Sequence, residues 1–153
     1  MKSEIISLPG FYILGIATRT TNKGGRSQID IGELWKRFFA EDLFLQIPRR
    51  SGDDIYCLYT DFEQGGKAYY TAILGAKVQS LENTPELMLG KTIPAQHYLR
   101  FQSIGKLPDC VQATWAHIWN STLPRAFQAD FDVYGPAASN PLDAVVETFV
   151  SVA

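Results

Sequence analysis

The stretch Ile31–Ala40, "IGELWKRFFA", carries large apolar side chains three and four residues apart, while its charged residues fall between them. The residues at this spacing are Ile31, Leu34, Trp35, Phe38 and Phe39. Such a pattern predicts an amphipathic helix that packs one face on a core. A second stretch, Pro108–Leu123, "PDCVQATWAHIWNSTL", repeats the pattern. Its apolar stripe consists of Val111, Trp115, Ile118 and Trp119.

The same order of expected strands surrounds each predicted helix. A strand from about Phe11 precedes the first helix, and the hairpin Ile55–Phe62 and Ala68–Val78 follows it around "EQGGK". A strand over Ile93–Gly105 precedes the second helix, and two strands follow it, over Phe127–Tyr134 and Val145–Val152. The order strand, helix, strand, strand therefore occurs twice, over about residues 4–80 and 92–153.

Short segments of the two halves also align. "LPGFYI" from Leu8 aligns with "IPAQHY" from Ile93, "DIYCLY" with "ADFDVY", and Trp35 with Trp115. We expect one α+β domain over residues 1–153, built from duplicated β-α-β-β units with pseudo-twofold symmetry. Its antiparallel sheet and two main helices would leave a central ligand cleft between the units.

Composition excludes several classes of protein. The net charge of −2 offers no basic patch, so we expect no direct contact with nucleic acid. No apolar run is long enough to cross a membrane and no signal peptide is visible, so we expect a cytoplasmic protein. Cys57 and Cys110 lie far apart and should be reduced, and His97 and His117 have no ligand-spaced partners, so we expect no metal and no cofactor. The glycine-rich "KGGRS" lacks the phosphate-loop pattern and reads as a flexible loop.

An ordered set of segments resembles a known family. The segments are "LPGFYILGI", "IGELWKRF", "DIYCLYTDFEQGGKAYYTAILGAKV", "TIPAQHYLRFQSIGKLPDCVQATWAHIW" and "ADFDVYGPAASNPLDAVVETFVSV". Together they resemble the GyrI-like, or effector-binding, domain of AraC- and MerR-type multidrug-responsive regulators, in a free-standing form. The resemblance covers nearly the whole chain, so no DNA-binding domain is expected. It implies a small-molecule-binding protein whose ligand is a lipophilic, cationic drug or dye held in an aromatic pocket around a central acid.

Two acidic residues are candidates for that central acid. The "DFDVY" element matches the family's usual Asp-Phe-Glu-x-Tyr, with Asp132 in the place of the glutamate. Asp132 shares a strand face with Tyr134 by the two-residue period, and that face is either a cleft wall or a solvated surface. Glu147 in "AVVETFVSV" is either a second pocket acid or an exposed edge residue, whereas Asp130 is expected in water.

Aromatic residues are the other candidate ligand contacts. Tyr56, Tyr59 and Tyr70 crowd one hairpin, where they would form the walls for a flat aromatic cation or simply pack as strand residues. Phe39, Trp115 and Trp119 lie on helical stripes that usually form core, although a pair of tryptophans one turn apart can also hold a ligand.

Two other functions remain open. A hydrolase of reactive small molecules would use Glu147 or Asp132 as base and a hairpin tyrosine as acid. A protein-interaction module would inhibit a DNA-acting enzyme or serve a separate regulator. No nucleophile motif is visible, so we name no catalytic residue and favour a binding protein over an enzyme.

Overall fold

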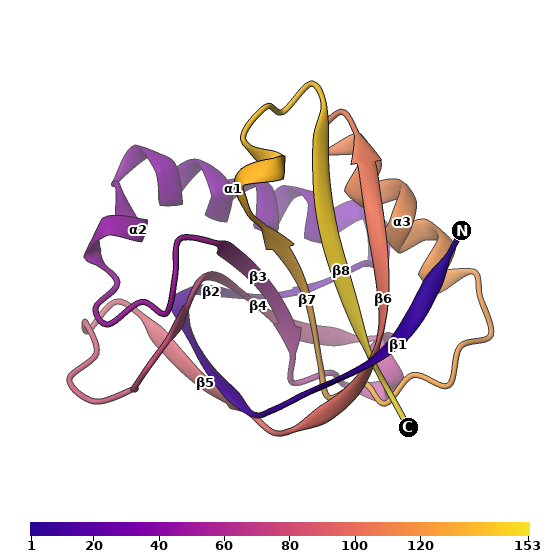
Figure 1. Ribbon diagram of the computed structural model, residues 1–153, viewed down its shortest axis with the longest axis horizontal. Coiled ribbons are helices and arrows are strands. Elements are labelled where there is room, and N and C mark those ends of the chain that lie inside the picture. The colour runs from indigo at the N-terminus through magenta and orange to yellow at the C-terminus, as the bar shows by residue number, and fades with distance from the viewer.

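One eight-stranded antiparallel sheet and two main helices form the protein. The computed structural model describes all residues, 1–153. Its strands are β1 (Ser3–Leu8), β2 (Phe11–Thr21), β3 (Ile55–Thr60), β4 (Tyr69–Val78), β5 (Leu89–Ile93), β6 (Gln96–Gly105), β7 (Ala129–Tyr134) and β8 (Ala144–Val152). Its helices are α1 (Arg26–Ala40), the short α2 (Leu43–Gln46) and α3 (Asp109–Trp119) (Figure 1). The predicted α+β class and the repeated β-α-β-β order are confirmed.

The order of strands in the sheet shows the pseudo-twofold symmetry directly. The order is β1-β6-β8-β7-β3-β4-β2-β5, and every neighbouring pair is antiparallel. Exchanging each strand for its counterpart in the other half reverses this order and leaves it otherwise unchanged. The symmetry axis runs between the central strands β3 and β7, where Cys57 lies directly opposite Asp132.

The two edge strands, β1 and β5, were not expected from the sequence. β1 pairs with β6 and β5 pairs with β2, so each half gives one strand to the other half's side of the sheet. The single strand predicted over 93–105 is in fact the end of β5 followed by β6, separated at Pro94–Ala95. Pro94 supplies no backbone N–H for a ladder, which favours a break at this point. Pro9 and Gly10 make the equivalent break between β1 and β2.

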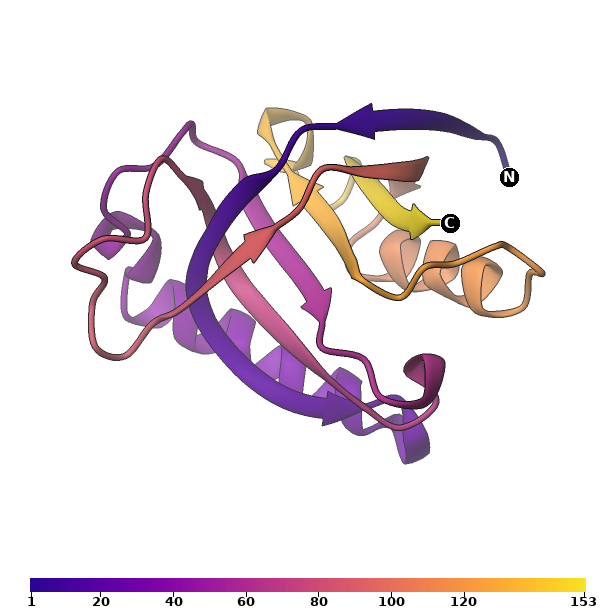
Figure 2. The ribbon, with the colours of Figure 1, turned by 90° about the horizontal axis from the view of Figure 1, so that it is seen from below.

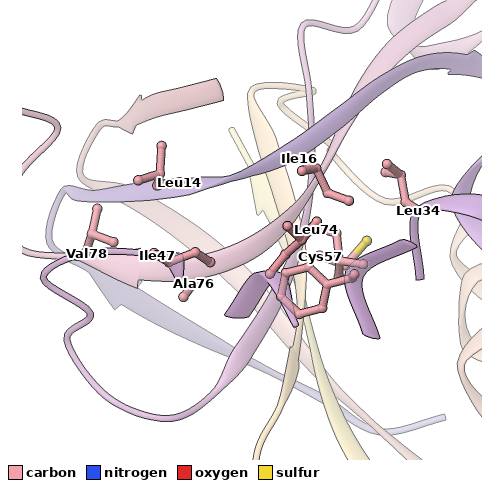
Figure 3. Close-up of a cluster of buried hydrophobic side chains, with 10 residues drawn as sticks. Leu14, Ile16, Leu34, Ile47, Cys57, Leu74, Ala76 and Val78 are labelled. Carbon is pink, nitrogen blue, oxygen red and sulfur yellow. The ribbon is translucent and has the colours of Figure 1, made fainter. Parts of the chain in front are cut away.

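Both main helices pack on the same face of the sheet (Figure 2). A cluster of ten buried residues joins α1 and α2 to this face, including Leu14, Leu34, Phe38 and Cys57 (Figure 3). Ile118 of α3 packs on Phe101 and Val150 in the same way. A third cluster, which includes Leu58, Phe131 and Phe149, covers the opposite face. Burying such side chains stabilises the fold by roughly 1.5–3 kcal/mol each.

Helix α1 begins earlier than the apolar pattern indicates. The predicted loop "KGGRS" is a 3-10 turn, Lys23–Gly25, that leads directly into α1 at Arg26. Gly24 and Gly25 have φ values of 64° and 71°, which side-chain-bearing residues rarely adopt. Asp30 then accepts hydrogen bonds from Thr20 of β2 and Arg26, which fixes the first turn of the helix against the sheet. The glycine-rich segment is therefore an ordered turn, and it lies at one end of the cavity described in the next subsection.

Candidate functional site

A cavity of about 730 Å³ lies over the central strands between α1 and α3. Residues of both helices line it, together with the ends of β3, β4 and β7 and the turn that precedes α1. Many of its large side chains are aromatic: Trp35, Tyr59, Phe62, Tyr70, Trp115, Trp119 and Tyr134. The cavity is therefore a cleft between the two halves, at the place where the duplicated architecture predicts one.

The aromatic rings of the cavity pack across the symmetry axis. Trp35 of the first half contacts Tyr134 of the second, with ring centroids 4.8 Å apart and an edge-to-face arrangement. Trp115 of the second half contacts Tyr59 of the first in the same manner, at 5.2 Å. Aromatic pairs favour the edge-to-face arrangement, so each of these contacts holds both of its rings in place. Each half of the protein therefore helps to orient the cavity rings of the other half.

Asp132 lies directly beneath this wall and is fully buried. Its carboxylate accepts hydrogen bonds from the Tyr59 hydroxyl at 2.7 Å and the Thr148 hydroxyl at 2.6 Å. The indole Nε1 of Trp115 lies 3.1 and 3.2 Å from its two oxygens. Burial raises the pKa of Asp132 to about 6, although these three donors act in the opposite direction. At neutral pH the site therefore holds a carboxylate under the rings of Tyr59 and Trp115.

Asp130 is also fully buried, so the expectation that it is exposed is wrong. Its carboxylate forms an ion pair of 2.8 Å with Arg125 and accepts hydrogen bonds from the backbone N–H and hydroxyl of Ser151. The side chain of Arg125 is only 6% exposed. A buried charge needs a partner. The partner of Asp130 is Arg125, which comes from the loop before β7, and the alternating pattern of the strand gives no sign of it.

Four predicted aromatic or acidic contacts belong to the cavity wall, and one lies behind it. Tyr59, Tyr70, Trp115 and Trp119 line the cavity. Asp132 does not reach the cavity surface itself and acts on it through Tyr59 and Trp115.

The three remaining candidates lie elsewhere. Glu147 sits opposite Val133 and Gln102, on the sheet face that points away from the helices, and forms an ion pair with Arg100 at 3.5 Å. Tyr56 precedes Cys57 in β3, so its ring points to that same far face, where its centroid lies 5.8 Å from that of the Phe131 ring. Phe39 follows the buried Phe38 on α1 and is 61% exposed. Of the two pairs that the hydrolase hypothesis allowed, Glu147 with a hairpin tyrosine is therefore not formed, whereas Asp132 accepts a hydrogen bond from the hairpin residue Tyr59.

Several cavity residues were not recognised from the sequence. The positively charged residues Lys23, Lys67 and Arg125 line the cavity, and no aspartate or glutamate does. Lys23 and Lys67 adjoin the glycine pairs Gly24–Gly25 and Gly65–Gly66. In the sequence, the only sign of these positive residues is a pair of Gly-Gly turns that each adjoin a lysine. The pairing of β2 with β4 shows that the two turns lie at the same end of the sheet.

Other features of the chain carry no site. Both cysteine thiols are free, Cys57 in β3 and Cys110 in α3, and burial raises the pKa of Cys57 to about 12. No group of three or more His, Cys, Asp or Glu side chains is arranged to hold a metal ion. None of the helices is long and apolar enough to span a membrane.

Comparison with known proteins identifies the family. The family model of Cass2, the integron-associated effector binding protein, matches residues 4–152. The chain belongs to the Cass2 family. It is 28% identical to YobU of Bacillus subtilis (strain 168), which is named as a transcriptional regulator protein, over 98% of this chain and 97% of YobU. The transcriptional regulator BrlR of Pseudomonas aeruginosa is 27% identical over 94% of this chain, which spans only 52% of BrlR.

Solved structures share the fold. SAV2435 bound to tetraphenylphosphonium superposes on this Cass2-family chain with a TM-score of 0.83 at 17% identity, covering 100% of this chain and 94% of that one. The integron cassette protein VCH_CASS2, from the mobile metagenome of Vibrio cholerae, gives a TM-score of 0.75 at 22% identity, with 99% and 95% covered. The chain is thus an effector-binding domain of the transcription-regulator type.

Proposed function

We propose that this Cass2-family protein binds lipophilic aromatic small molecules in the cavity and prefers those with a delocalised positive charge. One observation carries the proposal: the aromatic cavity has a buried carboxylate, Asp132, hydrogen-bonded to two of the rings that line it. SAV2435, which has the same fold, was solved with the organic cation tetraphenylphosphonium.

The rings and the carboxylate favour a cation for the same reason. The face of an aromatic ring is electron-rich and attracts positive charge, with a contribution of about 1 kcal/mol per contact. A carboxylate that accepts hydrogen bonds from Tyr59 and Trp115 increases the negative potential at the cavity surface. For two unit charges roughly 8 Å apart in an effective dielectric of about 20, the attraction is about 2 kcal/mol.

Apolar walls also explain why such a site would accept many ligands. Aromatic surfaces attract flat molecules of different outline, and one buried charge selects for sign but not for shape. A cavity of about 730 Å³ has room for a molecule of several rings. We therefore expect broad specificity and modest affinity.

Tetraphenylphosphonium and tetraphenylborate provide the test, because they have nearly the same shape and opposite charge. We expect the wild-type protein to bind the phosphonium at least about thirtyfold more tightly in calorimetric titrations at neutral pH, because an attraction of about 2 kcal/mol corresponds to that factor and the borate is repelled where the phosphonium is attracted. Asp132→Asn should weaken phosphonium binding by about thirtyfold and should not weaken borate binding. Glu147→Gln, which removes a charge from the far face, is the matched control and should change neither affinity. Equal affinities for the two ions in both wild type and Asp132→Asn would contradict a preference for cations.

A further inference from the structure

The charged residues at the surface of the cavity are all positive. Lys23, Lys67 and Arg125 line it, whereas the carboxylates of Asp130 and Asp132 lie beneath the surface. Arg125 is neutralised by its ion pair with Asp130. Lys23 and Lys67 form no ion pair, so they are the two cavity residues whose charge is free to act on a ligand.

Both lysines lie just beyond the same end of the β2–β4 ladder and line the cavity there. The ladder between β2 and β4 ends with Thr21 opposite Tyr69. Lys23 lies two residues after Thr21, at the start of the turn before α1, and Lys67 lies two residues before Tyr69, at the end of the turn before β4; both line the cavity. Two acids that lie a few residues away along the chain already have partners, Glu63 with Arg19 and Asp30 with Arg26. This end of the cavity, defined by Lys23 and Lys67, is the lysine end.

Arg125, whose charge is offset by Asp130, lies beside the lysine end. Its guanidinium lies over the rings of Trp119 and Phe127, at 4.4 and 4.3 Å from their centroids. Its Nη2 atom donates a hydrogen bond to Asp130, whereas its Nε and Nη1 atoms are buried and donate none. A Cβ on Gly66, the neighbour of Lys67, would meet those same two rings, at 2.7 and 3.1 Å. Arg125 is therefore close behind the turn that carries Lys67.

A continuous row of contacts separates the lysine end from the carboxylate. Asn22, next to Lys23, accepts a hydrogen bond of 2.6 Å from the hydroxyl of Tyr70. The Tyr70 ring packs on the Tyr59 ring at a centroid distance of 6.2 Å, and Tyr59 donates to Asp132. The cavity thus has a negative floor under Tyr59 and a positive rim two aromatic side chains away.

From this polarity we infer that the cavity selects aromatic zwitterions: flat cations that carry a carboxylate or another anionic acceptor on the same scaffold. The inference rests on the proposed function and narrows its ligand class. The ring system with its positive charge lies over Tyr59 and Trp115, and the anionic group reaches Lys23 and Lys67. Because both lysines are exposed, their attraction is screened by salt, and we expect it to contribute a few-fold in affinity rather than orders of magnitude.

A carboxyl-bearing rhodamine and its methyl ester are the matched probes. The two dyes share one cationic ring system, and only the first has a free carboxylate at neutral pH. Fluorescence anisotropy at low salt should show the free acid binding about threefold to fivefold more tightly than the ester. This advantage should shrink as sodium chloride is added, because the lysine end is open to solvent.

Variants assign the advantage to the lysine end. Lys23→Gln/Lys67→Gln should remove the preference for the free acid and leave binding of the ester unchanged or slightly stronger. Lys2→Gln/Lys106→Gln changes the net charge equally at exposed positions that do not line the cavity, and should keep the preference. If the ester binds as tightly as the free acid in wild type, or if both double variants lose the preference alike, the inference is wrong while the proposed function stands. If neither dye binds, both are overturned.

Discussion

At the scale of single residues, the buried carboxylate of Asp132 destabilises the fold when it is ionised, and it also places a negative charge beneath the cavity. It is fully buried, and its burial outweighs three hydrogen bonds, so its pKa is raised to about 6 from an ordinary value of 3.8. A raised acid pKa means that the folded state binds the proton more tightly than the unfolded state does. The ionised form present at neutral pH therefore reduces the free energy of unfolding, and a bound cation would offset that loss.

We predict that this residue makes the protein more stable as the pH is lowered from about 7.5 to about 5. The contribution is complete below the unfolded pKa and is lost as the pH rises through about 6. Over this range it should increase the free energy of unfolding of wild type relative to Asp132→Asn by about 1 kcal/mol. Urea denaturation of both proteins at several pH values measures the difference, and Asp130 is common to both and cancels. A difference that stays constant, or that decreases toward low pH, would mean that Asp132 is not held at a raised pKa.

The two aspartates also mark how far residue-level reasoning from sequence can go. The strand period and the family resemblance both direct attention to Asp132, and it lies at the site. The same period places Asp130 on the same face, but its partner Arg125 comes from a loop whose path no local pattern encodes. Glu147 and Asp132 look equivalent in sequence, and only the pairing of Glu147 with Val133 rather than with Asp132 puts it on the far face.

At the scale of elements, Gly15 and Gly75 form the closest approach between two strands. They lie opposite each other in β2 and β4, near the middle of β2. A Cβ on Gly15 would lie 2.1 Å from the carbonyl oxygen of Leu74, and one on Gly75 would lie 2.0 Å from that of Leu14. Both obstacles are backbone atoms, which cannot move aside as the end of a flexible side chain can.

We therefore predict that Gly15→Ala lowers the free energy of unfolding by about 3 kcal/mol, because the two strands must separate to admit a methyl group. Thermal or urea unfolding measures the loss. Gly32→Ala is the matched control: a Cβ at this position in α1 meets nothing within 4 Å, and replacing a helical glycine should stabilise the protein by up to about 1 kcal/mol. Similar effects at the two positions would show that the close approach of β2 and β4 does not constrain the sheet.

Elements with strong periodicity could be predicted, and elements defined by a partner could not. The two helices and the β3–β4 hairpin have clear apolar patterns and Gly-rich turns, and all three are present. β1 has mostly exposed side chains, and β5 is short with no regular alternation of buried and exposed residues, so no pattern indicates either strand; they form because β6 and β2 offer free edges. The start of α1 was missed since Gly24 and Gly25 resemble a loop in composition although they fix a turn.

At the scale of the molecule, the exchange of β1 and β5 makes the two halves dependent on each other. The core on the far face combines Ile13, Leu58 and Ile73 of the first half with Ile93, Tyr98 and Phe131 of the second. Neither half alone would cover this surface, and the edges of β2 and β6 would be left unpaired.

We predict that the fragments 1–81 and 82–153 are each unfolded when expressed separately and form a folded complex when mixed. The cut falls between β4 and β5, where no strand is interrupted. Circular dichroism should show a cooperative thermal transition for the mixture and none for either fragment, because folding requires the surface that the partner supplies. A cooperative transition for one isolated fragment would show that a half is an independent unit.

The position of the symmetry axis limits how alike the two halves can become. Cys57 and Asp132 are counterparts in the two halves and also direct neighbours across the axis, and the charge of Asp132 helps to raise the pKa of the Cys57 thiol. An acid in both places would set two buried carboxylates against each other, and such a pair cannot ionise together. The two halves can therefore share their scaffold and aromatic walls, but only one of the two equivalent central positions can carry a carboxylate. Under the proposed function, a cation between the halves would be drawn toward Asp132, to one side of the symmetry axis.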